Sequence, residues 1–217
     1  MGGINTDIIT VNTQSSIRIV NADGTVIYAD PLGIDGEPRD ADLILITHSH
    51  YDHFSQEDIA KIRKPSTKFV IPKSMINDLE KTGVTMMDYV SMEEGDRVGT
   101  AGVYIHAVPA YNKLKPFHPR RNKWLGYILE TDGLRIYIAG DTDALKENTA
   151  LICDIAMIPI GGTYTMNAKE ASAFINELRP AVVIPTHYGS IVGKPSDFDE
   201  FKKRVDEGIE VVKKLNF

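Results

Sequence analysis

THSHYDH, residues 47–53, is the stretch of sequence around which the whole chain is organised. It holds three of the six histidines of the chain and one aspartate, in the pattern His-x-His-x-Asp-His. Neutral imidazole and carboxylate are the usual protein ligands of zinc and similar divalent ions. His48 and His50 alternate, so their rings point to one side of an extended segment, whereas Asp52 and His53 follow where the chain should turn. The stretch therefore predicts ligands for two neighbouring metal ions rather than a histidine-rich surface loop.

Three short apolar runs each end in a side chain that can bind a metal. The runs ADLILIT, RIYIAG and AVVIPT lead to His48, Asp141 and His187. Short apolar runs of this kind are typical of buried strands, and strand ends at one edge of a sandwich can converge. Taken singly, Asp141 also fits a turn or cap residue, and His187 also fits a hydrogen-bonded core histidine. The three runs together predict one metal centre at a sheet edge.

The order of the predicted elements indicates a layered α/β fold. Strands are predicted in both halves of the chain, with helices among them. Asn167 and Ser196 are expected to cap two of the helices, and Lys64-Pro65 is expected to end another. Two mixed sheets stacked face to face, with helices on the outer faces, give a four-layer α/β/β/α sandwich. We expect residues 1–217 to form a single domain of this kind.

The composition limits the classes of function. The net charge is −6 and the isoelectric point is about 5.5, so no nucleic-acid partner is expected. No apolar run reaches the roughly 18 residues of a membrane span, and MGGINTDII lacks the pattern of a signal peptide. Cys153 is the single cysteine, which favours a reducing, cytoplasmic location. The sequence neither requires nor excludes a homo-oligomer.

Three motifs in order resemble the metallo-β-lactamase superfamily over nearly the whole chain: THSHYDH, AGDT at 139–142 and PTHYG at 185–189. The segments VPAYN, PIGGTYTMNAKEA and IPTHYG are more narrowly similar to the ascorbate-6-phosphate-lactonase-like metallohydrolases. That branch includes relatives of the N-acylphosphatidylethanolamine-hydrolysing phospholipase D. The resemblance implies one or two divalent ions, with zinc expected first and manganese as the alternative. It implies that one ion is held by His48 and His50, the second by Asp52, His53 and His187, and that Asp141 bridges them.

One position departs from the pattern of the superfamily. Many members have a further histidine where this chain has Asn112. An amide oxygen is a poor zinc ligand beside imidazole, so the first metal position is expected to be weak, to prefer a harder metal, or to use His118 instead. His118 is a candidate ligand and, with Asp52, a candidate catalytic residue. His106, within a predicted strand, is expected to be structural.

The expected chemistry is hydrolysis of a small-molecule substrate, because a pair of divalent ions activates water and stabilises developing negative charge. A small anionic ester or lactone, such as a sugar-phosphate lactone, is the favoured substrate. The alternatives are a phosphodiesterase, of nuclease or phospholipase D type, and a non-catalytic metal-binding protein. The basic loop from Asn112 to Lys123 is either an anion clamp or a solvated surface loop. The candidate substrate contacts are Asn112, Lys123, Tyr164 and Thr165.

Overall fold

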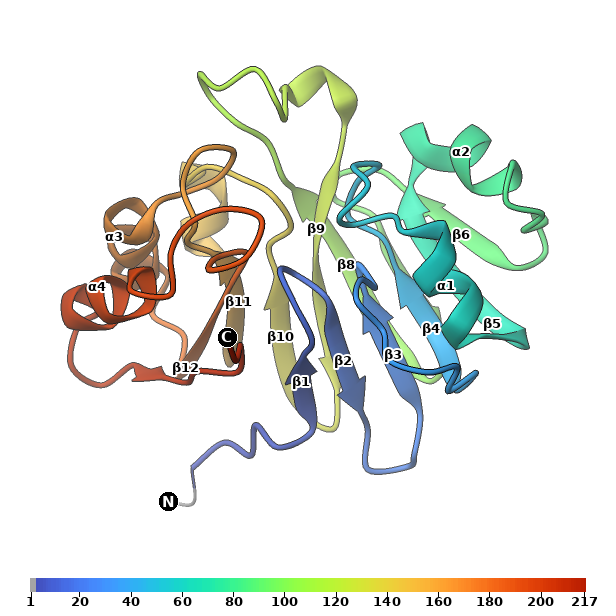
Figure 1. Cartoon of the computed structure of the whole chain (residues 1–217), viewed down its shortest axis with the longest axis horizontal. Coiled ribbons are helices and arrows are strands. Elements are labelled where there is room, and N and C mark those ends of the chain that lie inside the picture. The colour runs from blue at the N-terminus through green and yellow to red at the C-terminus, as the bar shows by residue number, and fades with distance from the viewer. Residues whose placement is uncertain (1–2) are drawn as a thin grey trace.

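The computed structural model describes residues 3–217 and contains two mixed β-sheets (Figure 1). The first sheet has six strands in sequence order: β1 (Ile9–Val11), β2 (Ile17–Val20), β3 (Val26–Ala29), β4 (Ala41–Leu45), β5 (Arg63–Pro72) and β6 (Tyr89–Met92). The second sheet has the order β13-β12-β11-β10-β9-β8-β7. Its strands are β7 (Arg97–Thr100), β8 (Val103–Pro109), β9 (Leu125–Thr131), β10 (Leu134–Ile138), β11 (Ile155–Pro159), β12 (Val182–Thr186) and β13 (Glu210–Val211). Each sheet combines parallel and antiparallel neighbours.

Helices cover the outer faces of the two sheets (Figure 1). On the first sheet lie α1 (Gln56–Ile62) and α2 (Ile76–Glu80), whose side chains Ile59, Ile62 and Leu79 are buried in a cluster with strand residues. On the second sheet lie α3 (Ala168–Leu178) and α4 (Asp197–Arg204), which contribute Phe174 and Phe201 to the larger core cluster. Within residues 3–217, three short 3-10 helices complete the list: η1 (Lys73–Met75), η2 (Arg120–Asn122) and η3 (Lys146–Ala150). The predicted four-layer α/β/β/α class is therefore confirmed.

The burial of each strand follows from its place in the layers. Every residue of β11 and β12 is buried, because these strands lie between the core and the helices. The start of β8 alternates instead, with Val103 and Ile105 buried and Tyr104 exposed. The central core is formed by side chains from both sheets, so the sheets pack face to face.

One of the two predicted helix caps needs correction. The cap at Asn167 is confirmed, since its Oδ1 accepts from the backbone N–H of Glu170 at 2.9 Å while the Glu170 carboxylate accepts from Asn167 N–H at 3.0 Å. Ser196 precedes α4, but its side chain makes no capping hydrogen bond. The first helix ends at Ile62, as expected from the Lys64-Pro65 pair that follows it. That pair itself lies within the ten-residue strand β5.

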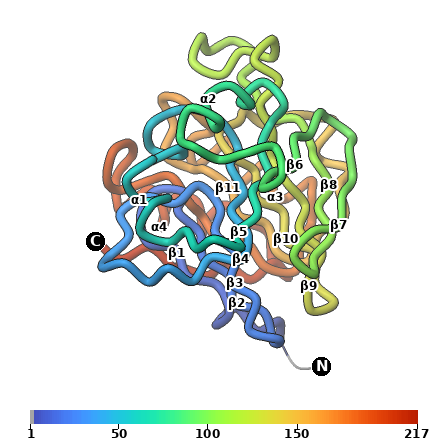
Figure 2. Tube along the Cα trace, turned by 90° about the vertical axis from the view of Figure 1, so that its right-hand side faces the viewer, coloured from blue at the N-terminus to red at the C-terminus, as the bar shows by residue number. Residues whose placement is uncertain are grey.

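The two sheets are joined at the end of β4. The Leu125 N–H donates to Thr47 O at 3.2 Å, and the Tyr127 hydroxyl donates to Ile46 O at 2.7 Å. The yellow-green segment between β8 and β9 extends beyond the sheets at the top of both views (Figures 1 and 2). Within residues 3–217, no helix has the length and apolar character needed to span a membrane. No signal peptide is expected in MGGINTDII, and the first two residues of that segment lie outside the described residues.

Candidate metal centre

The histidine-rich stretch forms a tight turn between β4 and α1. The backbone N–H groups of His53 and Phe54 both donate to His50 O, at 3.0 and 2.8 Å. Ser55 then caps α1, because its hydroxyl oxygen accepts from the Asp58 N–H at 3.2 Å. The turn is thus fixed at both ends, and it holds its imidazole and carboxylate groups at the edge of the first sheet.

The second sheet delivers Asp141 after β10 and His187 after β12. Gly140 precedes Asp141 with a φ of +62°, and a Cβ there would lie 3.0 Å from the Thr47 Cβ, so the two sheet ends approach closely. His187 itself has a φ of 55°, and its N–H donates to Gln14 O at 2.9 Å. A Cβ on Gly161 would lie 2.2 Å from His187 O, so only glycine fits beside this turn.

The first group of possible ligands consists of His48, His50 and His118, whose ligand atoms lie within 4.8 Å of one another. The Nε2 of His48 is 3.1 Å from the Nδ1 of His50. The ring of His118 lies 5.0 Å from that of His48 and 4.8 Å from that of His50, between centroids. His118 therefore occupies the position that the sequence left open at Asn112, and this group offers three imidazoles.

The second group consists of Asp52, His53 and His187. The Asp52 Oδ2 is 3.6 Å from His53 Nε2 and 3.4 Å from His187 Nε2. Asp141 lies between the two groups. Its Oδ2 is 3.2 Å from His118 Nε2, 3.3 Å from His187 Nε2 and 4.0 Å from His48 Nε2, and its Oδ1 is 3.3 Å from His53 Nε2. One carboxylate therefore contacts both groups.

These residues fit divalent metal ions. Among residues 3–217, four converging ligand atoms are buried without a hydrogen-bond partner: the Nε2 atoms of His53, His118 and His187, and the Oδ1 of Asp141. A buried polar atom without a partner costs roughly 1–3 kcal/mol, so four in one place call for a common partner. Imidazole nitrogen and carboxylate oxygen are zinc ligands, and both groups offer at least three of them.

Burial and nearby charge set the protonation of the ligands. Burial lowers the pKa of His48 well below its ordinary value, and it also lowers the pKa of His50, so both rings favour the neutral form that binds metal. Burial alone would raise the pKa of Asp141, but His187 and His53 hold that pKa well below the usual range of a carboxyl group. Asp141 is thereby kept as an anion.

Asp30, which sequence reasoning missed, braces the centre from behind. It is fully buried after β3, and its Oδ2 lies 2.7 Å from His53 Nδ1. Its two oxygens also accept from the N–H and the hydroxyl of Thr47, at 2.8 and 2.6 Å, and that hydroxyl lies 2.9 Å from His48 Nδ1. Carboxylates that orient ligand histidines are common around metals. The available signal was an acidic residue at the end of the apolar run TVIYA.

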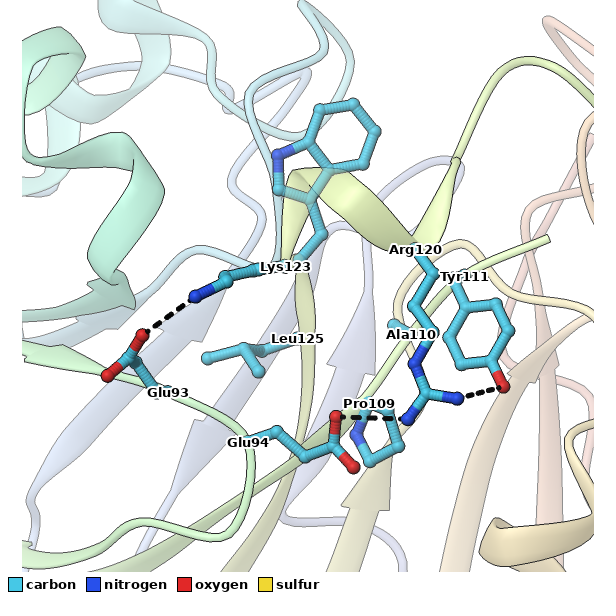
Figure 3. A pocket seen from close by; sticks show the side chains of 9 residues that line it. Glu93, Glu94, Pro109, Ala110, Tyr111, Arg120, Lys123 and Leu125 are labelled. Carbon is cyan, nitrogen blue, oxygen red and sulfur yellow. Dashed lines mark hydrogen bonds and ion pairs between the residues drawn. The ribbon is translucent and has the colours of Figure 1, made fainter.

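The residues predicted to contact substrate, and His106, lie at different distances from the metal ligands. Asn112 is buried, and its Nδ2 donates to Tyr164 O at 2.7 Å and lies 3.3 Å from His118 Nδ1, so it supports His118. Thr165 is buried, and its hydroxyl contacts backbone carbonyls. Lys123 is exposed and pairs with Glu93 at 3.2 Å, in a separate pocket (Figure 3). His106 lies on β8, outside both ligand groups, as expected.

The ligand groups open into a cavity of about 250 Å³. Tyr164 is the one predicted substrate contact on its wall. Its lining residues are His50, Tyr51, Asp52, Phe117, His118, Asp141, Tyr164 and Ile191. A small molecule can therefore reach the ligand atoms from outside.

Comparison with known proteins identifies the family. The family model of the beta-lactamase superfamily domain matches residues 8–187. A UPF0173 metal-dependent hydrolase of Thermococcus onnurineus (strain NA1) is 37% identical over 186 residues, covering 81% of this chain and 80% of the relative. A solved structure from Parabacteroides distasonis is 33% identical, with a TM-score of 0.80 and coverage of 96% and 93%. Igni18, a metallo hydrolase from Ignicoccus hospitalis, is 26% identical, with a TM-score of 0.76 and coverage of 96% and 95%. The chain belongs to the beta-lactamase superfamily, within its UPF0173 metal-dependent hydrolases.

Proposed function

We propose that this protein hydrolyses an ester or lactone bond of a small molecule and uses two divalent ions, zinc first and manganese as the alternative. The observation on which this rests is the set of buried, unpartnered imidazole nitrogens that converge on Asp141 at the end of an open cavity. The name of the Thermococcus onnurineus relative, a metal-dependent hydrolase, supports the reaction class. The narrower likeness to the ascorbate-6-phosphate-lactonase branch stays a prediction.

The proposed ligands follow from the two groups. His48, His50 and His118 would hold one ion, and Asp52, His53 and His187 the other, with Asp141 shared. Each group then has three ligands of its own, so the position of His48, His50 and His118 is not proposed to bind its ion more weakly than the other position. Two such ions, when bound, lower the pKa of water and polarise the bond under attack.

The side chains contribute positioning and proton transfer. Asp52 lines the cavity, which supports its proposed role as the proton acceptor. Burial alone would raise its pKa, but contact with His187 and the charge of His53 lower it, so the carboxylate stays ionised at neutral pH. His118 is reassigned from catalysis to metal binding, Asn112 orients it, and Tyr164 is the proposed substrate contact.

The basic loop gives little support to the expected anionic substrate, because Lys115 and Lys123 in that loop pair with Asp143 and Glu93. The ester or lactone proposal is therefore kept without a charge requirement.

Metal content and turnover test the proposal together. Metal-free protein should bind about two zinc ions per chain and then hydrolyse 4-nitrophenyl esters or simple lactones. His48→Ala and Asp52→Ala should lose metal and most of the turnover while the far-ultraviolet circular dichroism is unchanged. Loss of metal with unchanged turnover would contradict the proposal. Faster turnover of bis(p-nitrophenyl) phosphate than of the esters and lactones would favour a phosphodiesterase. Bound metal without turnover of esters, lactones or phosphodiesters would favour a non-catalytic metal-binding protein.

A further inference from the structure

The cavity above the metal ligands has a polar floor and an apolar mouth. Three of its polar lining residues, Asp52, His118 and Asp141, are buried, with at most 8% of each residue exposed. Its apolar lining residues are open to solvent: Tyr51 is 70% exposed, and Phe117 and Ile191 are 45% and 46% exposed. Large apolar side chains that gather in the open at one cavity indicate a binding surface.

One wall of this mouth is a fixed aromatic pair. The rings of Phe117 and Tyr164 meet edge to face, with their centroids 4.6 Å apart and an angle of 82° between their planes. The two residues belong to different loops, and the hydrogen bond from Asn112 Nδ2 to Tyr164 O joins these loops at 2.7 Å. The wall is thereby tied to the loop that carries the proposed ligand His118. A rigid aromatic wall gains affinity for an apolar group because little side-chain freedom is lost on binding.

No lysine or arginine of residues 3–217 lines the cavity. Three basic side chains of the adjacent loop, those of Lys115, Arg120 and Lys123, are bound to other partners. Lys115 donates to Asp143 and to Thr165 O. In the separate pocket of Figure 3, Lys123 contacts Glu93, and Arg120 contacts Glu94 and the Tyr111 hydroxyl, at 3.2, 3.6 and 3.1 Å. A carboxylate or phosphate on the distal part of a substrate would therefore meet apolar side chains and no cation.

We infer that the mouth formed by Tyr51, Phe117, Tyr164 and Ile191 selects substrates with an uncharged, apolar acyl group of a few carbons. A cavity of about 250 Å³ is smaller than the roughly 300–1,000 Å³ of drug-sized sites, so a short chain fits and a macromolecular segment does not. This inference rests on the proposed function. In the reaction the acyl carbon–oxygen bond breaks, water supplies the oxygen that the acid keeps, and the alcohol leaves with a proton.

Two matched esters test the inference by their turnover. In 4-nitrophenyl pentanoate and the mono-4-nitrophenyl ester of glutaric acid, the leaving group and the chain length are the same, and only a terminal methyl or carboxylate differs. We expect kcat/KM for the neutral ester to be higher by about tenfold or more, because the carboxylate would be desolvated without a partner. Phe117→Ala should reduce this preference by about tenfold with zinc content unchanged. The matched control is Leu114→Ala, on the same loop, 96% exposed and outside the cavity, which should keep the preference.

Binding separates this inference from the proposed function. Calorimetry with the zinc-loaded protein would compare pentanohydroxamic acid with the monohydroxamic acid of glutaric acid, which need no turnover. The apolar mouth is supported if the neutral compound binds more tightly than the charged one and Phe117→Ala removes this difference. This holds even if no ester is hydrolysed, because the absence of hydrolysis would refute only the proposed function. Equal or tighter binding of the charged compound, or an equal or higher kcat/KM for the charged ester, would overturn the inference.

Discussion

Replacing Asp30 by asparagine tests how the fold holds the metal ligands. The carboxylate of Asp30 is buried and accepts from the Thr47 N–H on Oδ1 and from the Thr47 hydroxyl on Oδ2, and that Oδ2 also lies 2.7 Å from His53 Nδ1. An asparagine side chain at this position would have the same size, but an NH₂ donor would replace one of the two carboxylate oxygens. If the amide oxygen stays toward the Thr47 N–H, the new NH₂ group faces the Thr47 hydroxyl and His53 Nδ1, which both used Oδ2 as their acceptor.

The size of the effect follows from the two contacts on Oδ2. Hydrogen bonds to a charged group contribute roughly 1.5–3 kcal/mol each, so we expect the metal-free Asp30→Asn variant to lose about 3–6 kcal/mol of unfolding free energy. Because His53 would lose the partner that orients its ring, zinc should bind about 10–100-fold more weakly. That factor corresponds to about 1.4–2.8 kcal/mol of binding free energy.

Urea unfolding of the metal-free protein and competitive zinc titration measure the two quantities separately. Asp40→Asn is the matched control, since Asp40 is a part-buried aspartate that accepts from Arg18 at 2.7 Å and from the Tyr28 hydroxyl at 3.0 Å and contacts no proposed ligand. It should lower stability without weakening zinc binding. If Asp30→Asn bound zinc as tightly as the unaltered protein, the orienting role of Asp30 would be refuted.

Three further results are expected. His118→Ala should reduce bound zinc from two ions to about one in elemental analysis, whereas His106→Ala should leave it unchanged; equal content in both variants would exclude His118 as a ligand. Gly161→Ala should destabilise the protein by about 1–3 kcal/mol or more in urea unfolding, because its Cβ would lie 2.2 Å from a carbonyl oxygen, and Gly3→Ala, with nothing within 4 Å, should not. Burial raises the pKa of Cys153 to about 12, so its thiol should react slowly with Ellman's reagent in the folded protein and fast in urea; fast reaction of the folded protein would show the thiol to be accessible.

The fold was largely predictable because its signals are local. Apolar runs such as those before His48 and His187 identify buried strands, and the pair Asp132-Gly133 identifies a hairpin that the structure contains between β9 and β10. Element ends were less predictable. At Ser196 the residue type suits a cap, but the backbone there is helical, and the side chain makes no capping bond.

The ligands close together in sequence were predictable, and so were Asp141 and His187, because apolar runs lead to them. The place of His118 and the role of Asp30 were not. His48, His50, Asp52 and His53 lie within one turn, so their spacing alone brings them together. The place of His118 depends on how a loop of about a dozen residues closes over the sheet edge, and residue spacing cannot give that. Asp30 was missed for a related reason, because its partner His53 is 23 residues away and their contact exists only in the folded chain.

The most direct test of the metal centre is anomalous X-ray scattering at the zinc edge from crystals of the protein grown with zinc. Two peaks are predicted within about 2.0–2.2 Å of their protein ligands. One should lie among His48, His50 and His118, and the other among Asp52, His53 and His187, with Asp141 touching both. A density without zinc peaks at these residues, or with one peak that His118 does not contact, would contradict the two-ion centre on which the proposed hydrolysis depends.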